Sequence, residues 1–176
     1  MVDILEAYRS FDPPKWFRPT VDRLLASLAS EHTSNLRAIV LTDSHSIGKG
    51  KTQRVAGRKF RRSECLGFYN PAYRGEQPWI QLVVDNIIKS KSPSFLRLQL
   101  FRDLVVSKTL FHELGHHLHE TLGSASRGGE SAAHDWTRRL SRIHFRAKYW
   151  YLRPVVLALR PMLRFARNMA RRKAAA

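Results

Sequence analysis

The feature that most constrains this 176-residue chain is the segment His112-Glu113-Leu114-Gly115-His116. It lies within a stretch from Phe95 to about Leu122 whose apolar residues recur with helical spacing. On an α-helix, side chains four positions apart project from the same face. His112 and His116 are therefore expected to direct two imidazoles at one point, where they can bind a single Zn²⁺ ion.

The other two positions of this segment fit the same chemistry. Glu113 is adjacent to His112, so its carboxylate can reach a water on the open side of the metal and act as a general base. Gly115 adds little bulk, so another element could pack closely there. The segment thus predicts Glu113 as the catalytic residue and zinc as the cofactor.

A catalytic zinc site usually has three protein ligands and one open position. The candidates for the third ligand follow the first two in the sequence: His119, Glu130, His134 and Asp135. His119 would lie about 10 Å along the helix axis from His112, which is a long span for one ion. Glu130 and His134 belong to the next predicted helix, after a Gly-rich connection that can fold back over the site. We favour Glu130 and keep His134 as the alternative.

His112-Glu113-Leu114-Gly115-His116 followed by Glu130-Ser131-Ala132-Ala133 resembles the zincin superfamily of metallopeptidases. The specific resemblance is to gluzincin-like minimal domains of the ImmA/IrrE type, and it covers roughly residues 36–149. It implies that His112, His116 and Glu130 bind zinc and that Glu113 is the catalytic base. It also implies that the strand before the helix, Trp79–Asp85, is the sheet edge on which an extended protein or peptide substrate pairs. In a SprT-like arrangement, the nearest competing zincin type, His134 would be the third ligand.

The rest of the chain predicts an α+β, zincin-like fold with a small, mostly antiparallel sheet beside the active-site helix. The expected strands are 36–41, 65–69 and 79–85, and a helix is expected over 21–28. The polar, basic stretch 44–62 is expected to form an exposed hairpin or loop. We assign residues 1–149 to this domain and residues 150–176 to a basic, amphipathic C-terminal tail.

Charge is distributed unevenly along the chain, whose net charge is +17. Residues 127–173 carry 13 basic and 2 acidic residues, whereas residues 1–126 carry 18 basic and 12 acidic residues. Many of the arginines follow helical spacing: Arg139, Arg142, Arg146, Arg153, Arg160, Arg164, Arg167 and Arg171. Such a cationic stripe predicts one of three roles. The arginines form a solvated face, or they bind an anionic membrane surface, or they bind nucleic acid.

Two further observations narrow the class of protein. Cys65 is the only cysteine, which excludes an internal disulfide framework and a Cys-rich zinc site. The sequence has no run of about 18 apolar residues and no secretory signal pattern, so we expect a cytoplasmic protein that can be peripheral at a membrane. The sequence therefore predicts a zinc metallopeptidase. Its rivals are a non-catalytic zincin-fold module that acts through its basic surface and a DNA-associated protease.

Overall fold

The computed structural model describes residues 2–47, 52–55, 58–122, 128–152 and 154. The strands are β1 (Asp3–Ala7), β2 (Ala38–Thr42), β3 (Thr52–Val55), β4 (Arg58–Arg61), β5 (Gly67–Asn70) and β6 (Trp79–Val83). The α-helices are α1 (Phe17–Ala26), α2 (Val84–Lys89), α3 (Gln99–Thr121) and α4 (Gly129–Lys148). Short 3₁₀ helices cover Ser30–Thr33, Arg62–Glu64, Phe95–Arg97 and Trp150–Leu152.

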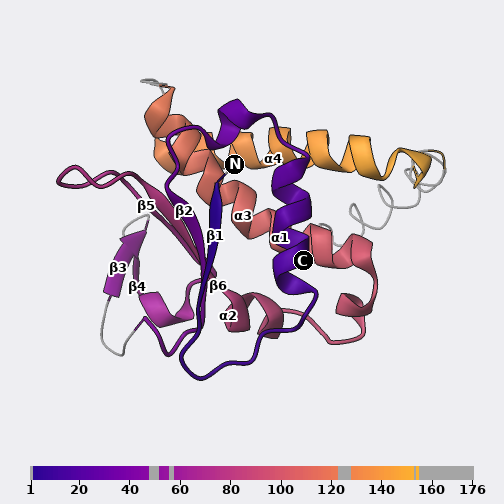
Figure 1. The fold of residues 1–176 in the computed structure, drawn as a ribbon, viewed down its shortest axis with the longest axis horizontal. Helices are drawn as coiled ribbons and strands as arrows, with labels where there is room; N and C mark the ends of the chain where they lie inside the picture. The colour runs from indigo at the N-terminus through magenta and orange to yellow at the C-terminus, as the bar shows by residue number, and fades with distance from the viewer. Residues whose placement is uncertain (1, 48–51, 56–57, 123–127, 153, 155–176) are drawn as a thin grey trace, which may run out of the picture.

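Four strands form one open sheet in the order β1-β2-β6-β5, and β3 and β4 form a separate antiparallel hairpin (Figure 1). The prediction of a mixed α and β fold is confirmed, but the prediction of a mostly antiparallel sheet is wrong. β1 pairs with β2 and β2 pairs with β6 in parallel, and only β5 runs antiparallel to its neighbour β6. For β1 and β2 the reason is the connection through α1, which returns the chain to the end of the sheet where β1 began, as a crossover between parallel strands must.

The helices pack mainly against one face of this sheet, and α3 is the central one (Figure 1). α3 contacts α1, α4, β5 and β6. Its core-facing stripe repeats every four residues and is almost fully buried, at Val106, Leu110, Leu114 and Leu118. This stripe meets the buried faces of α1, β2 and β6, which contribute Phe17, Val21, Leu24, Ile39, Leu41, Ile80 and Leu82. Burial of this stripe fixes which residues of α3 point away from the core.

A buried polar cluster joins α1, α3 and α4 near the start of α3. The Asp103 carboxylate pairs with the Arg23 guanidinium, accepts a hydrogen bond from the Tyr149 hydroxyl at 2.7 Å, and lies 3.2 Å from His144 Nε2. Burial by itself raises the pKa of Asp103, but the hydrogen bonds from His144, Arg23 and Tyr149 lower it to about 2. The cluster therefore holds the three helices together through a charged carboxylate.

Two sequence predictions concern the C-terminal part of the chain. The basic tail predicted at 150–176 lies outside the described residues apart from 150–152 and 154. Of the arginines in the predicted stripe, Arg139, Arg142 and Arg146 are described, and all three are exposed on α4. Among the helices that the structure describes, none has the length and apolar character needed to cross a membrane.

Candidate metal centre

α3 presents His112 and His116 on the side of the helix that faces away from its buried apolar stripe. Both side chains are about three-quarters buried, and their ring centroids are 4.8 Å apart. Burial lowers the pKa of each imidazole, which favours the neutral form that binds metals. The expected convergence of two imidazoles one helical turn apart is present in the structure.

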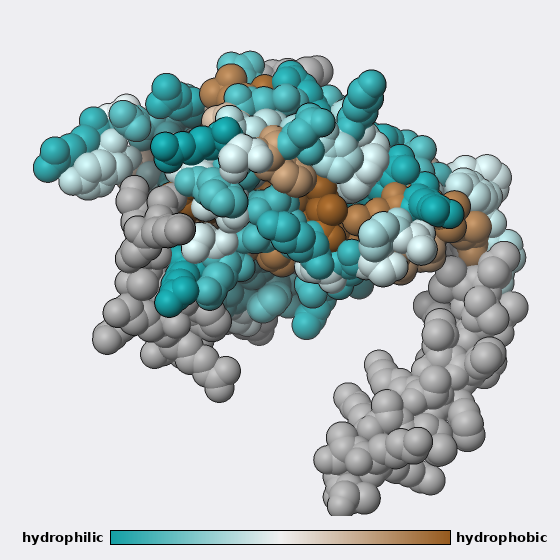
Figure 2. Space-filling view, turned by 90° about the horizontal axis from the view of Figure 1, so that it is seen from below, coloured by the Kyte–Doolittle hydropathy of each residue, from teal (hydrophilic) through white to brown (hydrophobic). Residues whose placement is uncertain are grey.

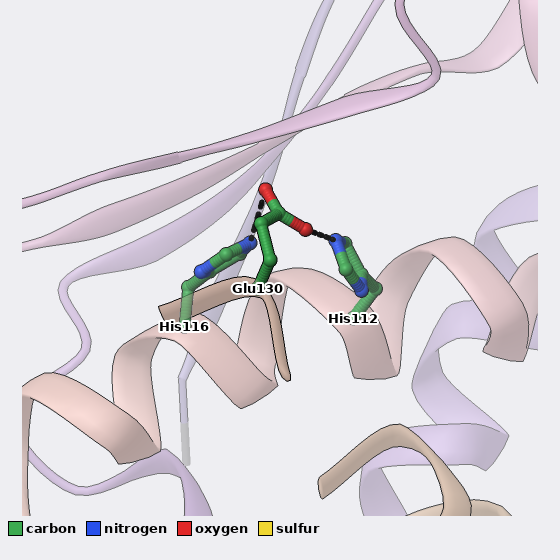
Figure 3. Close-up of side chains that lie close together, drawn as sticks. All are labelled: His112, His116 and Glu130. Carbon is green, nitrogen blue, oxygen red and sulfur yellow. Dashed lines mark ion pairs between the residues drawn. The ribbon is translucent and has the colours of Figure 1, made fainter. Parts of the chain in front are cut away.

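Glu130, in the first turn of α4, lies between the two histidines (Figure 3). Its Oε2 is 3.4 Å from His112 Nε2, and its Oε1 is 3.8 Å from His116 Nε2. The donor atoms of the three residues all lie within 4.8 Å of one another. Two ligands that share one zinc ion are each about 2 Å from it, hence at most about 4 Å apart. The nitrogen and carboxylate donors and their spacing fit a divalent metal after small side-chain adjustments.

His134, the alternative third ligand, also lies near the site but is placed differently. Its ring centroid is 4.9 Å from that of His112, and its side chain is exposed. In the described part of the chain, the group of donors close enough to hold one ion contains Glu130 and not His134. The geometry therefore favours Glu130 over His134.

Close packing between α3 and α4 brings Glu130 to the histidines, and Gly115 permits it. A Cβ at position 115 would lie 2.7 Å from the Ala133 carbonyl oxygen and 2.8 Å from Ala133 Cα. Both are backbone atoms, so no side-chain rotation could relieve the clash. The glycine within the sequence segment is thus the point at which the backbone of α4 rests on α3, one turn after Glu130.

Glu113 lies against β5, close enough to Glu130 for their carboxylates to interact electrostatically. It is 7% exposed, and the backbone N–H of Tyr69 in β5 donates a hydrogen bond to its carboxylate. Burial raises the pKa of the Glu113 carboxyl to about 7, although this hydrogen bond opposes the rise. A buried carboxylate beside the donor group is therefore held by the backbone of β5.

β5 is an edge strand of the sheet, and this corrects one expectation. The strand before the helix was expected to be the substrate-pairing edge, but β6 lies inside the sheet between β2 and β5. The strand order places β5 at the edge, although β5 precedes β6 in the sequence. A Cβ at Gly67 would lie 2.9 Å from Thr109 Cγ2 and 3.1 Å from Glu113 Cγ, so β5 passes directly over α3.

The contribution of β5 to the site was missed in the sequence. A backbone N–H leaves no residue-specific signal, so the role of Tyr69 could not be read from its side chain. The one signal was Gly67, because a glycine within a strand often marks a close backbone approach.

The remaining candidate ligands, His119 and Asp135, are not in the donor group of the described residues. Asp135 pairs with Arg138 at 3.3 Å. His119 is not in the donor group, and its Nδ1 is buried without a hydrogen-bond partner among the described residues.

Comparison with known proteins gives no independent assignment of a family or a function. No family model, no curated protein and no solved structure matches this chain. The chemical inference therefore depends on the site itself. Two neutral imidazoles and a carboxylate can bind a divalent metal, and a buried carboxylate next to them can exchange a proton with a water at that metal.

Proposed function

We propose that this protein is a zinc-dependent metallopeptidase with a zincin-like fold. One observation carries the proposal: His112, His116 and Glu130 converge beside the buried Glu113, under the edge strand β5. A structural metal site does not need a buried carboxylate held next to its ligands. A hydrolytic site needs one to accept a proton, together with an open edge where a peptide can bind.

Each residue has a separate task in this proposal. His112, His116 and Glu130 bind the ion through two nitrogens and a carboxylate. When bound, zinc supplies Lewis acidity that lowers the pKa of a water ligand towards about 7 and polarises a carbonyl. Glu113 accepts the proton of the attacking water and then delivers it to the leaving amine.

The substrate side of the site is the outer edge of β5. Because the Tyr69 N–H donates to Glu113, this backbone group faces away from β6 and towards α3. An extended peptide paired along this edge would pass the carboxylate with its main chain parallel to the strand. The substrate class is therefore a protein segment that is unfolded or exposed as an extended strand.

A second candidate function is binding through the basic surface, alone or together with proteolysis. It is favoured by the exposed Arg139, Arg142 and Arg146 on α4. These guanidinium groups could bind the phosphates of nucleic acid or of an anionic membrane. A binding module of this kind would not require Glu113.

Exchange of Glu113 for Gln tests the enzymatic proposal. We expect the zinc-loaded wild-type protein to cleave members of a peptide library, and Glu113→Gln to cleave them about 100- to 10,000-fold more slowly with its zinc content unchanged. The matched control is Glu31→Gln, the same exchange at an exposed carboxylate in the 3₁₀ helix Ser30–Thr33. Equal cleavage by the wild type and Glu113→Gln would refute the proposed role of this carboxylate.

A further inference from the structure

An apolar cavity of about 250 Å³ lies beside the site, between α2, the start of β5 and the first half of α3. Its apolar lining residues are Leu66, Ile87, Phe95, Leu104 and Val105. Three of them are unusually accessible for large apolar side chains, since Leu66 and Phe95 are 37% exposed and Leu104 is 41% exposed. Figure 2 views the molecule from the side of α2 and shows hydrophobic residues exposed near the middle of that face.

The charged residues that line this cavity are all cationic. They are Lys91, which follows α2, and Lys108 on α3, and both are exposed. No acidic residue of the described chain lines the cavity. Lys108 precedes His112 by four residues, so it lies about 6 Å from that ligand along the helix axis. An apolar hollow whose charged lining groups are both ammonium groups is complementary to an apolar group that carries a nearby negative charge.

The cavity adjoins the residues that surround Glu113. Thr109 lines the cavity, and its methyl group lies 2.9 Å from the position of a Cβ on Gly67. The same position is 3.1 Å from Glu113 Cγ, so one small patch of α3 and β5 borders both the cavity and the buried carboxylate. Leu66, which also lines the cavity, immediately precedes Gly67. A peptide that follows the edge of β5 past Glu113 reaches the cavity within two or three residues, because a strand advances about 3.3 Å per residue.

We propose that this cavity is a specificity subsite for an extended peptide, which places a large apolar side chain between Leu66 and Leu104 and an adjacent acidic side chain against Lys91 and Lys108. This inference rests on the proposed function, because it assigns the substrate class of the same site. The volume suits one large side chain and is below that of the pockets that enclose drug-sized ligands, about 300–1,000 Å³. The enzyme would thus act on sequences in which an apolar residue neighbours Asp or Glu.

Binding to the zinc-loaded Glu113→Gln protein tests the subsite without requiring turnover. The probes are three pools of fluorescent octapeptides with a fixed central pair, Leu-Glu, Ser-Glu or Leu-Lys, measured by fluorescence anisotropy. We expect the Leu-Glu pool to bind about tenfold more tightly than either other pool, because burial of a leucine side chain and a charge pair each contribute enough for that factor.

Variants of the lining residues separate the two parts of the preference. In the Glu113→Gln background, Lys91→Glu with Lys108→Glu should reverse the order of the Leu-Glu and Leu-Lys pools. Leu104→Ser should remove the advantage of Leu-Glu over Ser-Glu. The control is Arg18→Glu, an exposed charge reversal on α1 next to Glu6 of β1, at the sheet edge opposite β5, which should change neither ratio. Zinc content and melting temperature are measured for every variant, so that loss of the site or of the fold is recognised.

Three results would overturn the subsite: equal binding of the three pools, ratios that the lining variants leave unchanged, or wild-type dimers that form through this cavity and exclude the peptides. The proposed function has its own test, since the wild-type protein either cleaves the Leu-Glu pool or does not. Selective binding without any cleavage would refute the peptidase and retain the subsite. Cleavage without selective binding would support the peptidase and refute the subsite.

Discussion

Exchange of Gly115 for Ala tests whether the contact between α3 and α4 sets the geometry of the metal centre. The new Cβ would lie 2.7 Å from the Ala133 carbonyl oxygen, and ordinary contact begins at 3.4 Å. The backbone of α4 must therefore move by about 0.7 Å, the difference between these two distances. Binding sites tolerate displacements of about 0.5 Å, so Glu130, which lies one turn earlier on α4, would be displaced beyond that limit.

Two measurements follow from this displacement. Zinc affinity, determined by competition with a chromophoric chelator, should fall on the order of tenfold or more. The free energy of unfolding should fall by about 1–3 kcal/mol from overpacking, against a gain of up to about 1 kcal/mol in helix propensity. Gly128→Ala is the matched control, because a Cβ there meets no atom within 4 Å. A Gly115→Ala protein that is more stable than the wild type and binds zinc equally well would refute the proposed packing constraint.

Three more predictions concern the third ligand, the buried cluster and the basic surface. Glu130→Ala should abolish high-affinity zinc binding in the same chelator assay, and His134→Ala should retain it; the opposite result would make His134 the ligand. Because the pKa of Asp103 is lowered to about 2, its contribution to stability is present above pH 4 and is lost as the pH falls towards 2. Denaturant titrations should show a loss of about 2 kcal/mol over this range, and Asp103→Asn, though less stable at neutral pH, should lack this component of the loss. If the basic surface binds nucleic acid, Arg142→Glu with Arg146→Glu should weaken a salt-sensitive gel shift with DNA, whereas no shift at low salt in the wild type would exclude that function.

The sequence was informative where function depends on local spacing. Two histidines four residues apart on a helix must share a face, so their convergence could be predicted without a structure. The third ligand is harder to predict from the sequence, because Glu130 and His134 lie one turn apart on the same helix and both can reach the site. Their ranking depends on how α4 crosses α3, which the contact at Gly115 determines.

The sheet was predicted less well because strand order and direction are not local properties. β1 was missed because it is mostly exposed and contains Asp3 and Glu6, so it lacks the alternation of a half-buried strand. The parallel pairing of β1 with β2 depends on the return of the chain through α1. The choice of β5 over β6 as the edge depends on which strand inserts beside β2, and neither segment signals this in its sequence.

The most direct test of the central claim is the metal content of the purified protein, measured by inductively coupled plasma mass spectrometry before and after substitution of the proposed ligands. We expect about one zinc ion per wild-type chain, and loss of that ion in His112→Ala and His116→Ala while Glu113→Gln retains it. A wild-type protein that cannot bind zinc after exposure to it, or one whose zinc persists when both histidines are replaced, would contradict the proposed metal centre.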